Sequence, residues 1–236
     1  MKRVLVLFIM LIFNNIFSQG KIYFVYGSDT ATWDGMNTGK YNCYYGLSIF
    51  TADNTNTVTV MSDEFRNNIK DWYGNPLKFT WWMMAGNIYR FATNTNVPLA
   101  NTMTLHAMKE KFSTQIAKWG DELSLHYHTF AWTDYNNDGK YYWNQAHNFM
   151  ECKDDFDVTM AQYLLEENTY PVSFRSGWHY MDNEWQHYLN KLIPFGLHND
   201  YPAKRITDEE PIDNVYDWSL ASSKFVPFHP LDANYQ

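Results

Sequence analysis

The sequence has only two cysteines and no cluster of basic residues, and these shortages narrow the possible classes of protein. Cys43 and Cys152 stand far apart in the 236-residue chain, so they make no disulfide framework, although they could pair once or remain two buried thiols. Lysine and arginine number 18 against 26 acidic residues, for a net charge of −8. A chain with this balance is not expected to bind nucleic acid.

The chain also has few long hydrophobic runs, and the most prominent one lies at the N-terminus. Val4–Phe13 follows the basic residues Lys2 and Arg3 and precedes the small residue Ser18. The run is too short to span a bilayer, so this order predicts a secretory signal peptide over residues 1–18. A buried N-terminal strand or an uncleaved anchor helix is the alternative. The mature protein is expected to be secreted or periplasmic and to have no membrane partner.

The remaining residues, 19–236, show neither an internal repeat nor a linker, and we expect one domain. Loss of Lys2 and Arg3 leaves 16 of the 18 basic residues against 26 acidic ones, a net charge of −10. Hydrophobic patterning predicts alternating strands and helices, with a loop-rich segment over residues 31–60. The predicted strands are Lys21–Tyr26, Lys78–Met84, Glu122–His126, Pro171–Arg175 and Pro194–Leu197, and the predicted helices are Asp63–Trp72, Met103–Trp119, Phe156–Glu167 and Asn183–Leu192.

This alternation is typical of an α/β fold, with βα units around a parallel sheet or barrel. Ligands in such folds bind beyond the carboxyl ends of the strands. The third predicted strand ends there in His126 and His128. Residues i and i+2 of a strand point to the same face, so both imidazoles are aimed into one space, as a divalent metal site requires. A hydrogen-bonded aromatic cluster without metal is the alternative.

Other polar residues also follow predicted strands or lie in nearby loops. Asp29 ends the first strand and Asp34 follows it, Arg175 ends the fourth, and His229 lies near the C-terminus. An aspartate with two histidines is a usual hydrolytic metal set, and a second carboxylate can act as general base. The two aspartates could divide these roles in either order. Taken alone, Asp29 could be a turn residue and Arg175 a surface ion pair.

Aromatic residues make up 19% of the chain, a high proportion for a soluble domain. Flat amphipathic rings suit a sugar-binding cleft, although an aromatic core is the simpler explanation. The candidate substrate-binding rings are Trp33, Trp132 and Trp178. The expected partner is therefore a polysaccharide or oligosaccharide.

The segment Asp134–Lys140 imitates a calcium loop in its spacing of Asp, Asn, Asp and Gly. The twelfth position of that loop holds Gln145, where a calcium loop has a bidentate glutamate. A turn without an ion is therefore the favoured interpretation.

Three blocks, in this order, resemble a known family. An Asp29-bearing first strand, the block Gly120–His128 after a helix, and the block Ser173–Gly177 resemble the NodB-like polysaccharide deacetylases of carbohydrate esterase family 4. The resemblance covers most of residues 21–200. It implies a distorted (β/α) barrel of the glycoside hydrolase and deacetylase type, with parallel strands.

The resemblance also implies that a divalent metal, with zinc the expected ion, helps to remove acetyl groups from a polysaccharide. The metal set would be Asp34, His126 and His128, and the catalytic residues Asp29, Arg175 and His229. Two departures are visible. The family places its second histidine four residues after the first, where this chain has Phe130, and it carries an adjacent Asp-Asp pair that this chain lacks.

The last family motif has no clear match either, so the chain is expected to be a divergent member or truncated at its C-terminus. Two other functions stay open. One is a carbohydrate-binding protein that keeps the fold but has lost the chemistry. The other is a metal-independent glycosidase whose carboxylates would come from Asp29, Asp34 and Asp182.

Overall fold

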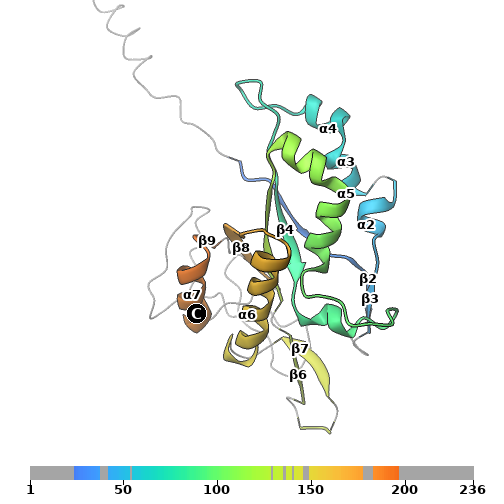
Figure 1. Ribbon diagram of the computed structural model, residues 1–236, viewed down its shortest axis with the longest axis vertical. Helices are drawn as coiled ribbons and strands as arrows, with labels where there is room; N and C mark the ends of the chain where they lie inside the picture. Colours follow the sequence, from blue (N-terminus) through green and yellow to red (C-terminus); the bar gives the residue numbers. More distant parts are fainter. Residues whose placement is uncertain are drawn as a thin grey trace, which may run out of the picture.

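The computed structural model describes residues 24–37, 42–53, 55–128, 130–134, 137–139, 141–145, 149–177 and 183–196, arranged as Figure 1 shows. Within these ranges, the side chains of residues 34–37, 42, 91, 130–133, 142–145, 183, 195 and 196 are not described. The predicted signal peptide, residues 1–18, lies outside the described residues. No helix in the described ranges is both long and apolar enough to cross a membrane.

A five-stranded parallel sheet forms the centre of the fold. Its strands, in spatial order, are β1 (Gly27–Thr30), β4 (Thr80–Ala85), β5 (Glu122–Tyr127), β8 (Ser173–Ser176) and β9 (Phe195–Gly196). The spatial order is also the order along the chain, so every connection steps in the same direction. Right-handed crossovers then place all the connecting helices on one face of the sheet. This is the winding of a barrel, whereas a doubly wound sheet reverses its direction. The predicted α/β class with parallel strands is confirmed.

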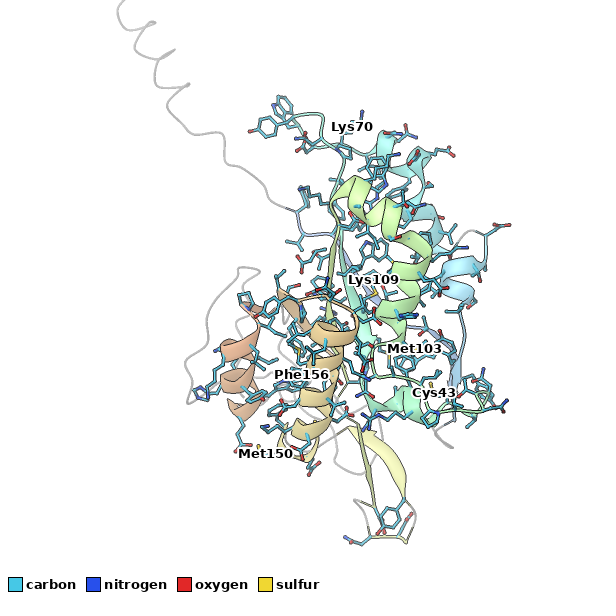
Figure 2. The ribbon with its side chains drawn as sticks, in the orientation of Figure 1. Cys43, Lys70, Met103, Lys109, Met150 and Phe156 are labelled. Carbon is cyan, nitrogen blue, oxygen red and sulfur yellow. The ribbon has the colours of Figure 1, made fainter. Side chains whose placement is uncertain are left out.

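The helices cover the outer face of the sheet. They are α2 (Ser48–Thr51), α3 (Asn56–Met61), α4 (Asp63–Asn68), α5 (Met103–Trp119), α6 (Lys153–Ala161) and α7 (Asn183–Leu192). In Figure 1, α5 and α6 run along the sheet and α7 lies beside α6. Alternate strand residues such as Met83, Leu125 and Phe174 pack against Phe156 of α6 and Trp185 of α7 in one buried cluster (Figure 2). Strand periodicity therefore leaves the other set of side chains on the inner face.

The sheet is curled, and its inner face is concave. Asp29 on β1 and Arg175 on β8 are three strands apart, which corresponds to about 14 Å across a flat sheet. Their side chains nevertheless meet, with Nε of Arg175 2.6 Å from Oδ2 of Asp29. The described strands thus form an open half-barrel, and a closed barrel is not seen among them.

A second, smaller core covers the carboxyl end of the inner face. It joins Met84 of β4 to Cys43, Ile88 and Tyr89, and Met103 packs against it (Figure 2). Cys43 belongs to the antiparallel pair β2 (Trp33–Asn37) and β3 (Asn42–Tyr45), and the 3₁₀ helix η1 (Asn87–Phe91) follows β4. The segment 31–60 therefore holds strands and helices where the sequence predicted loops.

Further elements lie between β5 and β8. The strands β6 (Phe130–Thr133) and β7 (Tyr142–Gln145) form a hairpin that projects from the sheet in Figure 1 and was not predicted. The 3₁₀ helix η2 (Phe149–Glu151) precedes α6, and the π-helix η3 (Gln162–Glu166) extends it. The π-helical turn carries Tyr163, which is buried and donates from its hydroxyl to the carbonyl oxygens of Met83 and Ser124. This side chain fixes α6 and η3 against two neighbouring strands.

Several predicted boundaries are confirmed because local chemistry fixes them. Helix α5 spans the predicted residues and ends at Gly120, whose φ of 67° is the left-handed conformation that a helix C-cap favours. Helix α4 begins after Ser62, as predicted, and the hydroxyl of Ser62 accepts a hydrogen bond from the amide of Phe65. Its end, at Asn68, comes earlier than predicted. Helix α7 also has the predicted bounds.

The predicted position of the first strand is wrong. The prediction placed it at Lys21–Tyr26, but β1 begins at Gly27, where pairing with Thr80 of β4 starts. Phe24 and Val25 are instead 72% and 70% exposed. The physical reason is the extent of the partner strand, since an apolar run gains little from strand pairing where no neighbour faces it. Gly27 also makes room for Trp82, because a Cβ at Gly27 would lie 2.0 Å from the indole ring.

A buried ion pair holds the amino-terminal end of the sheet. The side chains of Arg66 and Asp121 are both fully buried and in direct contact. Asp121 also accepts hydrogen bonds from the amide of Phe79 and from the indole N–H of Trp81. Arg66 donates further to the carbonyl oxygens of Val60 and Leu77. These bonds join α3, α4, the segment before β4, β4 itself and the residue that precedes β5.

Candidate functional site

Strand register brings the candidate residues together on the inner face. His126 of β5 pairs in register with Arg175 of β8 and with Met84 of β4. Asp29 of β1 lies one row below, in register with Trp82 of β4. Because parallel strands in register point alike, these side chains share the concave face near the carboxyl ends of the strands. The structure thus confirms that residues from three separate strands meet at one place.

His126 is held in a single tautomer by its neighbour on β8. The ring is 7% exposed, and its Nδ1 lies 3.1 Å from the carbonyl oxygen of Arg175. A carbonyl oxygen can only accept, so Nδ1 carries a proton, and in the neutral ring Nε2 presents its lone pair. Metal-binding histidines are commonly oriented in this way, by donating their second ring nitrogen to a carbonyl or carboxylate.

His128 completes the pair. Its Nε2 lies 2.9 Å from Nε2 of His126, and the two rings are nearly perpendicular, at 87°. His128 is 4% exposed, and the ring of Trp33 lies edge-on to it with centroids 5.9 Å apart. The i, i+2 spacing therefore does what the sequence predicted, since it directs both imidazoles to one point on the same face.

Asp29 and Arg175 form the second half of the site. The 2.6 Å contact between Nε of Arg175 and Oδ2 of Asp29 leaves Oδ1 of the carboxylate 3.9 Å from Nδ1 of His126. The Asp29 side chain is 36% exposed, so the ion pair adds at most about 1 kcal/mol to stability. Its main effect is to orient the carboxylate beside His126 at the opening of the concave face.

These positions allow a test of how well the residues fit a divalent metal. Two imidazole nitrogens at zinc-bond lengths and a tetrahedral angle lie about 3.3 Å apart, close to the observed separation of the His126 and His128 Nε2 atoms. Asp29 faces the opposite edge of the His126 ring, so it does not complete that set. The side chain of Asp34 lies outside the described part of the structure, and the described side chains alone contain no group of three or more possible ligands. The pair can thus supply two ligands, and the same 2.9 Å separation is that of a hydrogen bond between the rings without metal.

The base of the site contains residues that sequence reasoning missed. The indole of Trp82 donates to Oγ of Ser173 across two strands, at 2.9 Å, and Oγ of Ser173 lies 2.6 Å from a carboxylate oxygen of Glu122. Ser124 closes the β5–β8 edge here, since its hydroxyl contacts both the amide and the carbonyl of Ser173. The indole thus spans the inner face from Gly27 to Ser173, below the row of His126 and Arg175. The one sequence signal for this base of the site is that Glu122, Ser124 and His126 alternate along one strand and therefore share a face.

Other predicted residues play no described part in this site. His229 and Trp178 lie outside the described residues, and so does the side chain of Trp132. In the calcium-like segment, the carboxylate of Asp134 accepts hydrogen bonds from the amides of Asp138 and Gly139. These bonds close a turn, the structure that the sequence favoured for this segment.

The two cysteines are separate and buried. Cys43 and Cys152 are free thiols in different parts of the fold, which resolves the choice between a disulfide and two thiols. Burial raises the pKa of the Cys43 thiol from 9.0 to about 11. Both therefore act as core residues.

Comparison with known proteins adds no further information on this site. No family model matches the chain, and neither a curated protein nor a solved structure matches it.

Proposed function

We propose that the protein is a secreted, metal-dependent hydrolase that removes acetyl groups from a polysaccharide. The observation that carries the proposal is the convergence of His126, His128 and the Asp29–Arg175 pair on the concave face of a singly wound sheet. The resemblance to NodB-like deacetylases implies the same groups, namely paired histidines beside an aspartate base that an arginine supports. The fold is compatible with a distorted (β/α) barrel, of which the described strands would form half.

The geometry supports one division of the roles that the sequence left open between the two aspartates. Asp29 is paired with Arg175 and lies at the Nδ1 edge of His126, away from the two Nε2 atoms. Asp29 is therefore not a ligand of an ion held by those atoms. Asp34 is proposed as the third ligand beside His126 and His128, and the base role of Asp29 rests on the resemblance. Asp34 directly follows Trp33, whose ring contacts His128. When bound, zinc would polarise the acetyl carbonyl.

The chemistry of the remaining residues follows from their positions. Arg175 holds Oδ2 of Asp29, so the other carboxylate oxygen, Oδ1, is the atom that would take the proton from the attacking water. The carbonyl of Arg175 keeps the proton of His126 on Nδ1. One residue, Arg175, thus orients both the base and one ligand, through its side chain and its backbone. Protonation of the leaving amine or alkoxide is assigned to His229, which stays a sequence prediction.

Acetate release tests this function directly. The purified mature protein, loaded with zinc, is incubated with N-acetylglucosamine oligomers and separately with O-acetylated xylan, and free acetate is measured. We expect release from one of the two, and loss of release in the Asp29→Asn and His126→Ala variants. Binding of these glycans without acetate release would overturn the proposal in favour of a carbohydrate-binding protein. Chelator-resistant release of reducing sugar without acetate would favour a metal-independent glycosidase instead.

A further inference from the structure

The position of His128 depends on two glycines that flank it in the sheet. Strands β4, β5 and β8 end in register at Ala85, Tyr127 and Ser176. The next residue on each strand is Gly86, His128 and Gly177 respectively. His128 therefore has a glycine beside it on both sides, at the step where the parallel ladder ends.

Gly177 leaves the space that the imidazole occupies. A Cβ at this position would lie 2.3 Å from Cγ of His128 and 2.6 Å from two further ring atoms. Cγ is the ring atom nearest the backbone, so the ring could not swing aside without changing its rotamer. The backbone of Gly177 is not in the left-handed region, so an alanine here would add no backbone strain, and the three atoms nearest to its Cβ would all belong to His128.

Gly86 confines the residue from the other side. Its φ is 129°, a conformation that L-residues rarely adopt, and a Cβ would lie 3.2 Å from the carbonyl oxygen of His128. The amide of His128 in turn donates to the carbonyl of Ala85. The backbone of β4 thus fixes the main chain of His128, while Gly177 accommodates its ring.

We propose that Gly86 and Gly177 form a slot that positions His128 as the second metal ligand at a spacing of only two residues. The ring of His128 lies over Gly177 of the neighbouring strand where it meets His126, and the slot provides that space. This explains how the chain can replace the wider histidine spacing of the family it resembles. The inference rests on the proposed function for the metal, but the packing itself does not.

A double-mutant cycle tests the packing without any metal. Gly177→Ala is made in the natural protein and in the His128→Ala variant, and the folding equilibrium constant is measured by urea unfolding. Overpacking should lower this constant roughly 10-fold or more in the natural background and have little effect in the variant that lacks the ring. An equal loss in both backgrounds, or no loss in the natural one, would overturn the proposal.

Zinc binding supplies the second readout, by competition with a chromophoric chelator. Gly177→Ala should weaken zinc binding roughly 10- to 100-fold, as loss of a supporting contact does at other metal sites. The control is Gly74→Ala, which adds backbone strain at a φ of 84° but whose Cβ meets nothing within 4 Å, so its zinc affinity should match that of the natural protein. Unchanged affinity in Gly177→Ala would contradict the slot. If the natural protein binds no zinc, the metal assignment fails, and the unfolding cycle still decides the packing.

Discussion

The carboxylate of Asp29 and the guanidinium of Arg175 meet across three strand intervals, with 2.6 Å between Oδ2 and Nε. A flat parallel sheet would hold these strands about 14 Å apart. The contact therefore depends on the curl of the sheet, and the curl follows from a winding that puts every helix on the outer face. Fold and site are linked at this pair, because the same curvature that forms half of a barrel also brings the Asp29 carboxylate beside His126.

The Asp29–Arg175 pair should matter for chemistry far more than for stability. We expect Asp29→Asn to lower kcat by roughly 10²- to 10⁴-fold, since the variant has no carboxylate to accept a proton. The free energy of unfolding should change by less than about 1 kcal/mol, because the pair is partly exposed. Steady-state acetate release and urea unfolding of the same sample measure the two effects. A large loss of stability with retained activity would assign the pair a structural role only.

The buried Arg66–Asp121 pair, in contrast, should contribute strongly to folding stability. Asp121→Asn leaves the Arg66 charge buried and uncompensated, and should lower the free energy of unfolding by about 3–5 kcal/mol. The matched control is Asp63→Asn, which removes the exposed pair with Lys118 and should cost less than about 1 kcal/mol. Thermal and urea unfolding measure both variants. Equal effects would mean that burial of the first pair does not govern its contribution.

Alkaline pH should destabilise the fold partly through Cys43. Its folded pKa, about 11, lies above the value of 9.0 expected for an exposed thiol, so the folded state favours the neutral form. The contribution of this thiol to the free energy of unfolding is fully present below pH 9 and is lost as the pH rises toward 11. The loss amounts to about 2–3 kcal/mol by linkage.

The comparison that isolates Cys43 is the Cys43→Ala variant. Its free energy of unfolding should decline less steeply between pH 9 and 11 than that of the natural protein, although its value at neutral pH is lower because of the cavity. Urea unfolding at several pH values gives the two slopes. Identical slopes would show that ionisation of Cys43 is not linked to unfolding.

The parts of the fold that were predictable from sequence are those that local chemistry determines. The bounds of α5 follow from helical spacing and the C-cap glycine Gly120, and the start of α4 from the capping hydroxyl of Ser62. The first strand was misplaced because Phe24 and Val25 are apolar, whereas pairing with β4 decides where β1 begins. The hairpin β6–β7 was missed although the turn at Asp134–Gly139 was recognised.

The candidate site was predictable where it depends on periodicity along a single strand. That His126 and His128 share one face follows from their i, i+2 spacing. Gly177 could not be found in this way, because its role depends on the register between β5 and β8, which no local pattern encodes. The same holds for Trp82, whose indole crosses to Ser173 two strands away.

The most direct test of the central claim is metal dependence of the hydrolysis. The mature protein is stripped of metal with a chelator and titrated with zinc. Acetate release is then measured with the acetylated glycan that serves as its substrate in the first assay. We predict no release by the stripped protein and full recovery at one equivalent of zinc, with no recovery in the His126→Ala or His128→Ala variants. Release by the stripped protein, or zinc recovery that survives loss of either histidine, would contradict the account.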